Sequence, residues 1–303
     1  MPELPEVETV VMDLNQKIKG DVITDFWSEW PKAIKGKMLK EFQKEIKGRK
    51  IVGARRIGKN IFIDLSGGKT LYIHLKMTGH LLVKTQSRPP KARLFDPRQE
   101  TQLKPSFSSA HDYFADKVNQ YIRHKFFLGK NKVMEFSDVR KFAKIVLDDT
   151  QKIAELKEIK KLGVDALSPE FTFKKFGEIL EKQKHKPIGI ILMDQEKIAG
   201  IGNIYRSEIL YEAGVLPQRQ AGSLNAAEKK LIYKYIQKVL EKAIKLRGTS
   251  ESDYRDTSGA PGGFQKVMKI YKKTGKKCPK CDTMVERSTL AQRSVFFCPG
   301  CQK

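Results

Sequence analysis

The residues best suited to chemistry stand at the start of the chain, which reads Met1-Pro2-Glu3-Leu4-Pro5-Glu6. If Met1 is removed, Pro2 becomes a free secondary amine beside the Glu3 carboxylate. An α-amino group titrates at about 7.7–8, against about 10.4 for a lysine, so about a tenth of such amines are unprotonated at neutral pH. We therefore predict that Pro2 is a nucleophile that forms a covalent iminium with a sugar carbon. The alternative is that Pro2 only directs methionine removal and that Pro5 begins a helix.

A second cluster of reactive side chains lies at the other end of the chain. All four cysteines fall within the last 26 residues, as Cys278, Cys281, Cys298 and Cys301. They form two CxxC pairs separated by 16 residues, a spacing typical of a zinc site. Two such turns close a tetrahedral shell with sulfurs about 2.3 Å from the metal and no open position. We predict one structural Zn²⁺; disulfides are the alternative, disfavoured in a reducing cytosol.

The charge balance predicts a polyanionic partner. The chain carries 59 Lys+Arg against 35 Asp+Glu, a formal net charge of +24, with a dense basic run from Lys32 to Lys59. A phosphate backbone is the commonest partner of such a surface, although a non-specifically sticky surface or a membrane-facing patch are alternatives. Neither a signal peptide nor an apolar run of roughly 18–20 residues is evident. We expect a nucleic-acid-binding protein that is cytoplasmic and nucleoid-associated.

The element that must position Pro2 and Glu3 is an N-terminal helix. Pro5 suits its first turn, and Gly20 is well placed to end it. Apolar residues recur between them at helical spacing, at Val7, Val10, Val11, Leu14 and Ile18. Glu6 is expected either to cap this helix and interact with its dipole or to take part in catalysis.

The following part of the chain, to about residue 147, has a short, β-rich pattern. Strands are expected at residues 50–57, 60–65, 70–75, 121–128, 133–136 and 142–147. Ser66-Gly67-Gly68 and Gly129-Lys130-Asn131 are the expected hairpin turns. Strands in this number predict a two-layer sandwich or barrel. The proline-rich segment 85–116 predicts a long loop, either a tolerated insertion or an arm that contacts DNA.

After residue 147 the pattern becomes helical. Helices are expected at residues 152–161, 173–183, 187–193, 203–213 and 226–246. Residues 163–169 are predicted to be an interdomain linker, and residues 285–297 a hairpin between the cysteine pairs that presents Arg287 and Arg293. The fold class is therefore α+β and multidomain. We expect an N-terminal β-sandwich catalytic domain at 1–150, a helical DNA-binding domain at 164–262 and a zinc finger at 263–303.

Further residues form patterns that suit DNA contact. Ala199-Gly200-Ile201-Gly202-Asn203 lies between two expected helices, where glycines allow a phosphate to approach and the helix start offers free N–H groups. Lys59 follows a glycine between two strands and could reach a phosphate. Met77, Arg140 and Phe142 could enter a base stack, although Met77 and Phe142 would by default be core residues.

In combination, these motifs resemble formamidopyrimidine-DNA glycosylases over nearly the whole chain. The matching strings are the N-terminal Pro2–Thr9, Gly58-Lys59, His74–Gly79, Asp138–Phe142, Gly200–Ile209, Arg247–Thr249, Ser258–Gly262 and Ala291–Ser294 with the last cysteine pair. The resemblance implies a bifunctional DNA glycosylase and abasic-site lyase acting on oxidised purines. It also implies that the helical domain is of the helix–two-turns–helix type, and that the partner is double-stranded DNA with oxidised bases or abasic sites. We expect a monomer.

The resemblance also implies a role for each matching residue. Pro2 would be the nucleophile, Glu3 a general acid/base near the sugar ring oxygen, and Lys59 would bind phosphate and assist elimination. Arg293 joins these catalytic residues and, with Asn203, would grip phosphates that flank the lesion. The DNA-binding set comprises Met77, His124, Arg140, Phe142 and Asn203, of which Met77, Arg140 and Phe142 would fill the gap left by the everted nucleotide. Residues 248–264 would enclose the flipped purine.

The sequence departs from the family pattern at several positions. Lys76 stands where the family commonly has Gly, Val139 where it commonly has Pro, and Gly189 where it commonly has Lys; Lys184 or Lys186 could substitute for the last. Two other functions remain open. One is an endonuclease VIII-like glycosylase for oxidised pyrimidines, and the other is a non-catalytic protein that binds damaged DNA.

Overall fold

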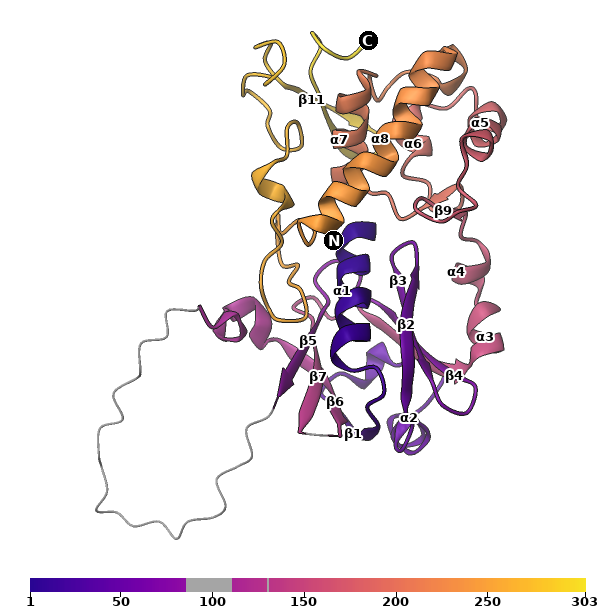
Figure 1. Cartoon of the computed structure of the whole chain (residues 1–303), viewed down its shortest axis with the longest axis vertical. Helices are drawn as coiled ribbons and strands as arrows, with labels where there is room; N and C mark the ends of the chain where they lie inside the picture. The colour runs from indigo at the N-terminus through magenta and orange to yellow at the C-terminus, as the bar shows by residue number, and fades with distance from the viewer. Residues whose placement is uncertain (86–110, 130) are drawn as a thin grey trace, which may run out of the picture.

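The computed structural model describes residues 1–85, 111–129 and 131–303, and its described part forms two lobes (Figure 1). One lobe carries the N-terminal helix and two β-sheets, and the other carries the remaining long helices and the C-terminal hairpin. The chain begins at the junction of the lobes, next to the lower end of the long helix α8. This arrangement places the predicted nucleophile between the two halves of the molecule.

The N-terminal helix α1 (Leu4–Lys17) forms as its apolar spacing predicts. Val7, Val10 and Leu14 are buried against the sheets, whereas Leu4 belongs to the core of the helical lobe. One helix therefore contributes to both cores. A capping box of Glu3 and Glu6 fixes its start.

Two four-stranded antiparallel sheets form the N-terminal sandwich. The first has the order β1-β6-β7-β5 and the second the order β2-β3-β4-β8. The strands are β1 (Ile23–Ser28), β2 (Ile51–Ile57), β3 (Asn60–Leu65), β4 (Lys69–His74), β5 (His80–Thr85), β6 (Ile122–Leu128), β7 (Lys132–Ser137) and β8 (Lys144–Asp149). Their facing apolar side chains and those of α1 form one core. The predicted β-sandwich with an N-terminal helix is confirmed.

Several elements differ from the sequence predictions. Strands β1 and β5 and helix α2 (Leu39–Ile46) were not predicted. Helix α2 lies in the dense basic run and buries only Phe42 and Ile46. The prediction for residues 85–116 lies mostly outside the described residues, as does Lys130 of the second expected turn. The described end of that segment contains a 3-10 turn at Tyr113–Ala115.

The helical lobe follows the predicted order. Helices α3 (Thr150–Ala154) and α4 (Lys157–Lys160) come first and pack on the second sheet of the sandwich through Ile153, Leu156 and Ile159. The elements of the helical lobe itself are β9 (Val164–Asp165), α5 (Phe173–Lys182), α6 (Ile188–Ile191), β10 (Ile198–Ala199), α7 (Asn203–Ala213) and α8 (Ala226–Lys245). The single helix expected at 152–161 is divided into α3 and α4. The segment 163–169, expected to be a linker, contains strand β9, which pairs in parallel with β10. Further short 3-10 helices, in both lobes, lie at Pro31–Ala33, Lys117–Gln120, Ala221–Ser223 and Phe264–Lys266.

The segment after α8 crosses back to the sandwich. The Val83 N–H donates to the Thr257 carbonyl at 2.8 Å. Arg247 donates to Asp13 of α1 at 2.6 Å and to Asp256 at 2.8 Å. These contacts join the two lobes through the loop that was expected to enclose the flipped base. In this structure the loop is anchored to α1 and β5.

The C-terminal finger contains the predicted hairpin, formed by β11 (Glu286–Leu290) and β12 (Arg293–Phe297). Its small core contains Cys278, Cys298, Val285 and Phe296 together with Ile270 and Tyr211, the latter from α7. Among the described residues, no helix is long and apolar enough to cross a bilayer.

Candidate active site

Glu3 is held at the junction of the lobes by the start of helix α7. Its side chain is 3% exposed. The N–H of Ile204 donates to Oε1 at 3.0 Å, and the N–H of Tyr205 donates to Oε2 at 3.4 Å. These are free N–H groups of the first helical turn, where the helix dipole favours a carboxylate. The turn expected to receive a phosphate therefore receives Glu3 of the same chain at these two N–H groups, and Pro2 lies buried directly beside it.

The two glycines before α7 are required by this close approach. A Cβ on Gly202 would lie 2.3 Å from Cδ of Glu3. Gly200 has a φ of +112°, and a Cβ there would lie 2.4 Å from Cδ1 of Leu4. The Leu4 N–H donates to the Gly200 carbonyl at 3.0 Å. The Gly-Ile-Gly sequence thus accommodates the N-terminus of α1.

Lys59, on the tight turn between β2 and β3, extends to the segment just before the first turn of α7, which binds Glu3. It is 7% exposed, and its Nζ donates to the Ile201 carbonyl at 3.0 Å. Burial lowers the pKa of Lys59, the carboxylates of Glu3 and Glu6 oppose that effect, and Arg293 adds to it. The four charged groups are therefore close enough to influence one another. The structure brings Lys59 to the predicted nucleophile.

Glu6 joins three segments around this centre. It is 1% exposed and accepts from the N–H groups of Glu3 and Thr249, both at 2.7 Å, and from the Tyr205 hydroxyl. Burial raises the pKa of Glu6 to about 7, and the neighbouring Glu3 carboxylate adds to the effect. Its hydrogen bond to the Glu3 N–H is the capping contact that the sequence suggested.

Met77, Arg140 and Phe142 form an exposed cluster at the edge of the sandwich. An Arg140 nitrogen lies 3.0 Å from Sδ of Met77, and the guanidinium lies 4.7 Å from the centre of the Phe142 ring. Met77 is 42% exposed and Phe142 is 52% exposed. Large apolar side chains with this exposure are not core residues, so the default assignment for them is wrong. Two apolar side chains beside an arginine guanidinium are suited to insertion between bases.

Asp138 and Thr78, which sequence reasoning did not select, position this cluster. The Thr78 hydroxyl donates to Oδ1 of Asp138, and the Arg140 N–H lies 3.1 Å from Thr78 Oγ1. Oδ2 of Asp138 accepts from the Ala143 N–H at 2.9 Å. A buried carboxylate thus links the two loops that carry Met77 and Arg140. The signal was present in the Asp138–Phe142 string, but its role is visible only when the loops are adjacent.

His74 and Lys76 were not among the predicted site residues. They line a cavity of about 300 Å³ together with Met1, Lys59 and Lys144. Nδ1 of His74 accepts from the Lys76 N–H at 2.9 Å, so the neutral ring carries its proton on Nε2. Burial, followed by the charges of the nearby lysines, lowers the pKa of His74 to about 3. Lys76 has a φ of +56°, which explains why glycine suits this position.

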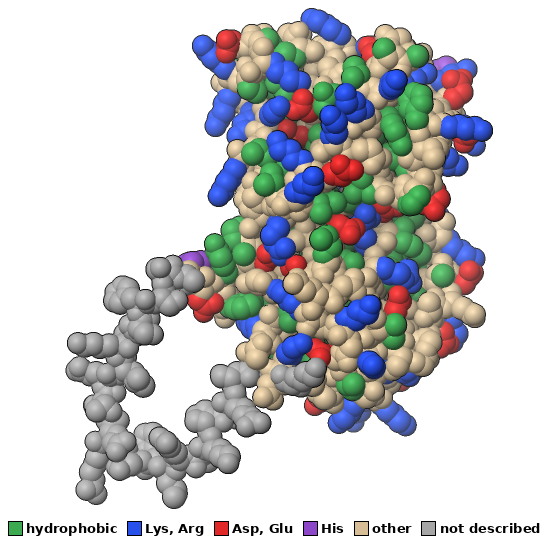
Figure 2. All heavy atoms as spheres, viewed as in Figure 1, with side chains coloured by type: hydrophobic (Ala, Val, Ile, Leu, Met, Phe, Trp, Pro, Cys, Tyr) green, Lys and Arg blue, Asp and Glu red, His purple; other side chains and the backbone are tan. Residues whose placement is uncertain are grey.

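Asn203 and Arg293 both line a second cavity, of about 520 Å³, between α7 and the finger. Lys272, Arg287 and Tyr271 also line it. The cations and the amide suit an anion such as a backbone phosphate. On the face shown in Figure 2, Lys and Arg side chains are spread over both lobes.

His124 lies apart from these contacts. It is 1% exposed, its Nδ1 is 2.9 Å from the Ser28 hydroxyl, and its ring stacks on Phe26. Burial lowers its pKa to about 4. A direct DNA contact requires the ring edge to become accessible, and the DNA-binding role of His124 stays a prediction.

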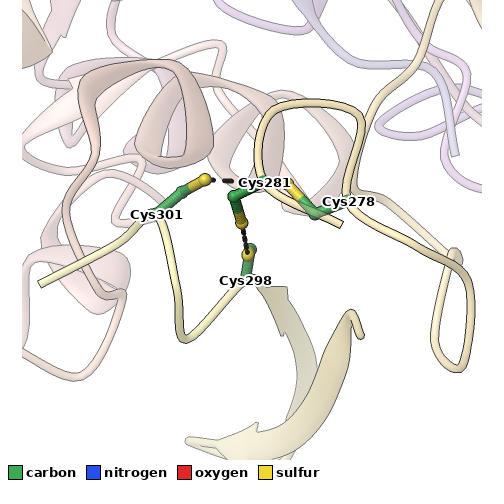
Figure 3. A group of neighbouring side chains, drawn as sticks. All are labelled: Cys278, Cys281, Cys298 and Cys301. Atoms are coloured by element: carbon green, nitrogen blue, oxygen red, sulfur yellow. Dashed lines mark hydrogen bonds between the residues drawn. The ribbon is translucent and has the colours of Figure 1, made fainter. Parts of the chain in front are cut away.

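The four cysteines converge as predicted (Figure 3). Their sulfurs all lie within 4.8 Å of one another, with Cys278 and Cys301 3.7 Å apart and Cys281 and Cys298 3.4 Å apart. A tetrahedral zinc with four thiolates requires sulfur separations of about 3.8 Å. The donor set therefore fits one structural zinc. The Tyr211 hydroxyl lies 3.2 Å from Sγ of Cys278 and links the site to α7.

A buried carboxylate and lysine beside a prolyl terminus, an exposed Met–Arg–Phe cluster and a four-cysteine finger on a helical lobe are the features expected of a DNA glycosylase with lyase activity. Comparisons with known proteins agree. Residues 1–145 match the formamidopyrimidine-DNA glycosylase N-terminal domain, residues 162–255 its H2TH domain and residues 275–303 a zinc finger found in FPG and IleRS. The chain belongs to the formamidopyrimidine-DNA glycosylase family.

Individual relatives support this assignment over the full length. The formamidopyrimidine-DNA glycosylase of Carboxydothermus hydrogenoformans is 37% identical over 303 residues, covering 100% of both chains. That of Pelotomaculum thermopropionicum is 36% identical, covering 100% of this chain and 99% of its own. The fold is similar to that of Lactococcus lactis Fpg in complex with abasic-site DNA, with 29% identity, 99% coverage of each chain and a TM-score of 0.81.

Proposed function

We propose that this chain removes oxidised purines from double-stranded DNA and cleaves the resulting abasic site, with Pro2 as the nucleophile. The observation that carries the proposal is the junction itself. There Pro2, Glu3 and Lys59 are brought together by α1, the start of α7 and the turn between β2 and β3. Simple binding of damaged DNA does not need a lysine buried beside a carboxylate at a prolyl terminus, whereas an endonuclease VIII-like glycosylase would use the same nucleophile and differs in the lesion it removes.

The proposed reaction begins with eversion of the damaged nucleotide, because its sugar C1′ is inaccessible inside a duplex. Met77, Arg140 and Phe142 fill the vacated space and offset part of the cost of unstacking. The Pro2 nitrogen then attacks C1′, and the damaged base leaves with the electron pair of its glycosidic bond. Ring opening yields an iminium between Pro2 and C1′, with Glu3 placed to exchange a proton with the ring oxygen.

The iminium then acts as an electron sink for strand cleavage. Loss of a C2′ proton expels the 3′ phosphate, and a second elimination expels the 5′ phosphate. Lys59 is proposed to stabilise phosphate and to assist proton transfer. Its lowered pKa favours the proton transfer. Arg293 and Asn203 are proposed to hold a neighbouring phosphate in their shared cavity.

The assignment extends to organisation and setting. We place a catalytic sandwich at 1–150, the helix–two-turns–helix domain at 164–262 and the finger at 263–303. The active site is complete within one chain, which supports a monomer. The proposed substrate places the protein at the nucleoid in the cytoplasm.

Trapping of the iminium tests the proposal. Protein with Met1 removed, checked by mass spectrometry, is incubated with 8-oxoguanine or abasic duplexes and borohydride. We expect a covalent complex that Pro2→Gly loses, whereas Pro5→Ala, in the first turn of α1, retains it. Binding without any trapped complex would support the non-catalytic alternative. Faster excision of thymine glycol than of 8-oxoguanine opposite cytosine would support the endonuclease VIII-like alternative.

A further inference from the structure

A cation lies buried beneath the cavity shared by Asn203 and Arg293. Arg206, in the first half of α7, is 1% exposed and is the largest of the fully buried side chains in the described part of the chain. Its Nη1 donates to the Gly189 carbonyl at 3.3 Å, and its Nη2 donates to the Ser294 carbonyl at 3.1 Å and to Oδ1 of Asn203. The guanidinium thus connects α6, α7 and the finger hairpin.

The surroundings of Arg206 leave its charge without a counterion. The three acceptors that the described residues supply are neutral, and the buried Nε has no hydrogen-bond partner among them. Burial lowers the pKa of Arg206 to about 10, Glu3 opposes this and Arg293 reinforces it. The group is still protonated at neutral pH. A buried cation of this kind is costly to the free protein unless an anion is supplied.

The hydrogen bond to Asn203 also determines which way its amide faces. Because Oδ1 accepts from Arg206, the Asn203 nitrogen remains as the donor for the cavity. A phosphate oxygen requires a donor, so this orientation suits DNA. Without the guanidinium, the amide would be free to present either end.

Arg206 also occupies the neighbourhood of the unusual Gly189. A Cβ on Gly189 would lie 2.8 Å from the Pro217 carbonyl oxygen and 3.1 Å from Cδ2 of Leu290, so no long side chain fits there without movement. The two lysines considered as substitutes, Lys184 and Lys186, are both exposed. The cation that contacts the Gly189 backbone is Arg206.

We propose that Arg206 is a positioning residue for a backbone phosphate of damaged DNA. Its hydrogen bond fixes the orientation of the Asn203 amide, and its charge replaces the positive charge that a lysine at position 189 would supply. The proposal rests on the proposed function, because it assumes that the cavity holds a DNA phosphate.

The decisive variant is Arg206→Met, which keeps length and apolar volume. Removal of an unpaired buried charge and loss of three hydrogen bonds have opposite effects on stability, so we expect the variant to fold, which the melting temperature checks. We expect the Kd for an abasic-analogue duplex to rise at least tenfold, with kcat at saturating DNA and borohydride trapping retained. Lys184→Ala and Lys186→Ala, as matched controls, should change the Kd less than twofold.

A double-mutant cycle separates positioning from general packing. If Arg206 acts through Asn203, Arg206→Met should have little further effect on the Kd in an Asn203→Ala background. Additive effects, an unchanged Kd in Arg206→Met, or losses confined to the two lysine variants would each overturn the proposal. Should Arg206→Met fail to fold, Arg206→Lys carries the same cycle. Failure of wild-type protein to trap DNA would instead count against the proposed function.

Discussion

At the scale of single residues, Glu6 links proton binding to stability. Its pKa is raised from 4.5 to about 7 in the folded protein, so the folded state binds the proton more tightly than the unfolded state. The contribution of protonated Glu6 to the free energy of unfolding is therefore fully present below about pH 4.5 and is lost as the pH rises through about 7. By linkage, that loss amounts to up to about 3 kcal/mol.

We predict that Glu6→Gln removes this dependence, because the amide stays neutral and its oxygen can still accept from Thr249. Urea unfolding at several values between pH 4.5 and 7.5 measures the effect, with the stability difference between wild type and variant read at each pH. A difference that does not change across this range would contradict the burial of an ionisable Glu6.

Lys76 carries backbone strain that a glycine would not. A left-handed conformation costs a residue with a Cβ about 1–2 kcal/mol, whereas glycine loses more entropy on folding. We predict that Lys76→Gly is more stable than Lys76→Ala by about 0.5–1 kcal/mol, although both lose the same charge. Chemical denaturation of the two variants makes the comparison. Equal stability would show that position 76 is not strained in solution.

At the scale of elements, the start of α7 binds the carboxylate of Glu3, the proposed general acid/base. Gly202→Ala would push the Glu3 side chain away, since the added Cβ cannot be accommodated 2.3 Å from Cδ. A displacement of about 1 Å at a reacting group costs about 10²-fold in rate, and we predict a loss of that order in kcat/KM for 8-oxoguanine excision.

The matched control for this prediction is Gly177→Ala in α5, where a Cβ would meet nothing within 4 Å. It should leave excision unchanged and stabilise the helix slightly. If the Gly202→Ala variant excises 8-oxoguanine at the wild-type rate, excision does not depend on the contact between Glu3 and the start of α7.

Much of the element order could be predicted from local pattern. Helices α1 and α8 have long apolar stripes, α7 is bounded by Gly202 and Gly214, and β2 and β3 are joined by a tight turn. Helix α2 was missed because its short sequence is charged and its two buried residues gain their meaning only by packing on β1. The division of the helix expected at 152–161 likewise depends on tertiary contacts.

The candidate site was predicted to a similar extent. Pro2, Glu3 and Lys59 stand in recognisable strings, and the structure brings them together. Asp138, Thr78 and Arg206 act through contacts between segments distant in sequence, which local pattern does not encode.

At the scale of the whole molecule, the finger packs against α7 and contains the four-cysteine zinc site. Its hairpin has a small core, and two of the buried residues in that core are metal-ligating cysteines. We predict that chelation unfolds the finger and weakens binding to abasic DNA at least tenfold, because the surface with Arg287 and Arg293 is lost. Covalent trapping at saturating DNA should persist. Full affinity after metal loss, verified by elemental analysis, would contradict a role for the finger in DNA binding.

Helix α1 belongs to both lobes, with Leu4 in one core and Val7 in the other. During synthesis, residues 1–17 leave the ribosome long before residues 200–205, which bind Glu3 and Leu4. A nascent or truncated chain that stops within the sandwich therefore has an amine but no assembled reaction centre. If Pro2 is the nucleophile as proposed, competence to attack DNA requires the helical lobe to be made and docked, and incomplete copies of the protein are expected to lack it.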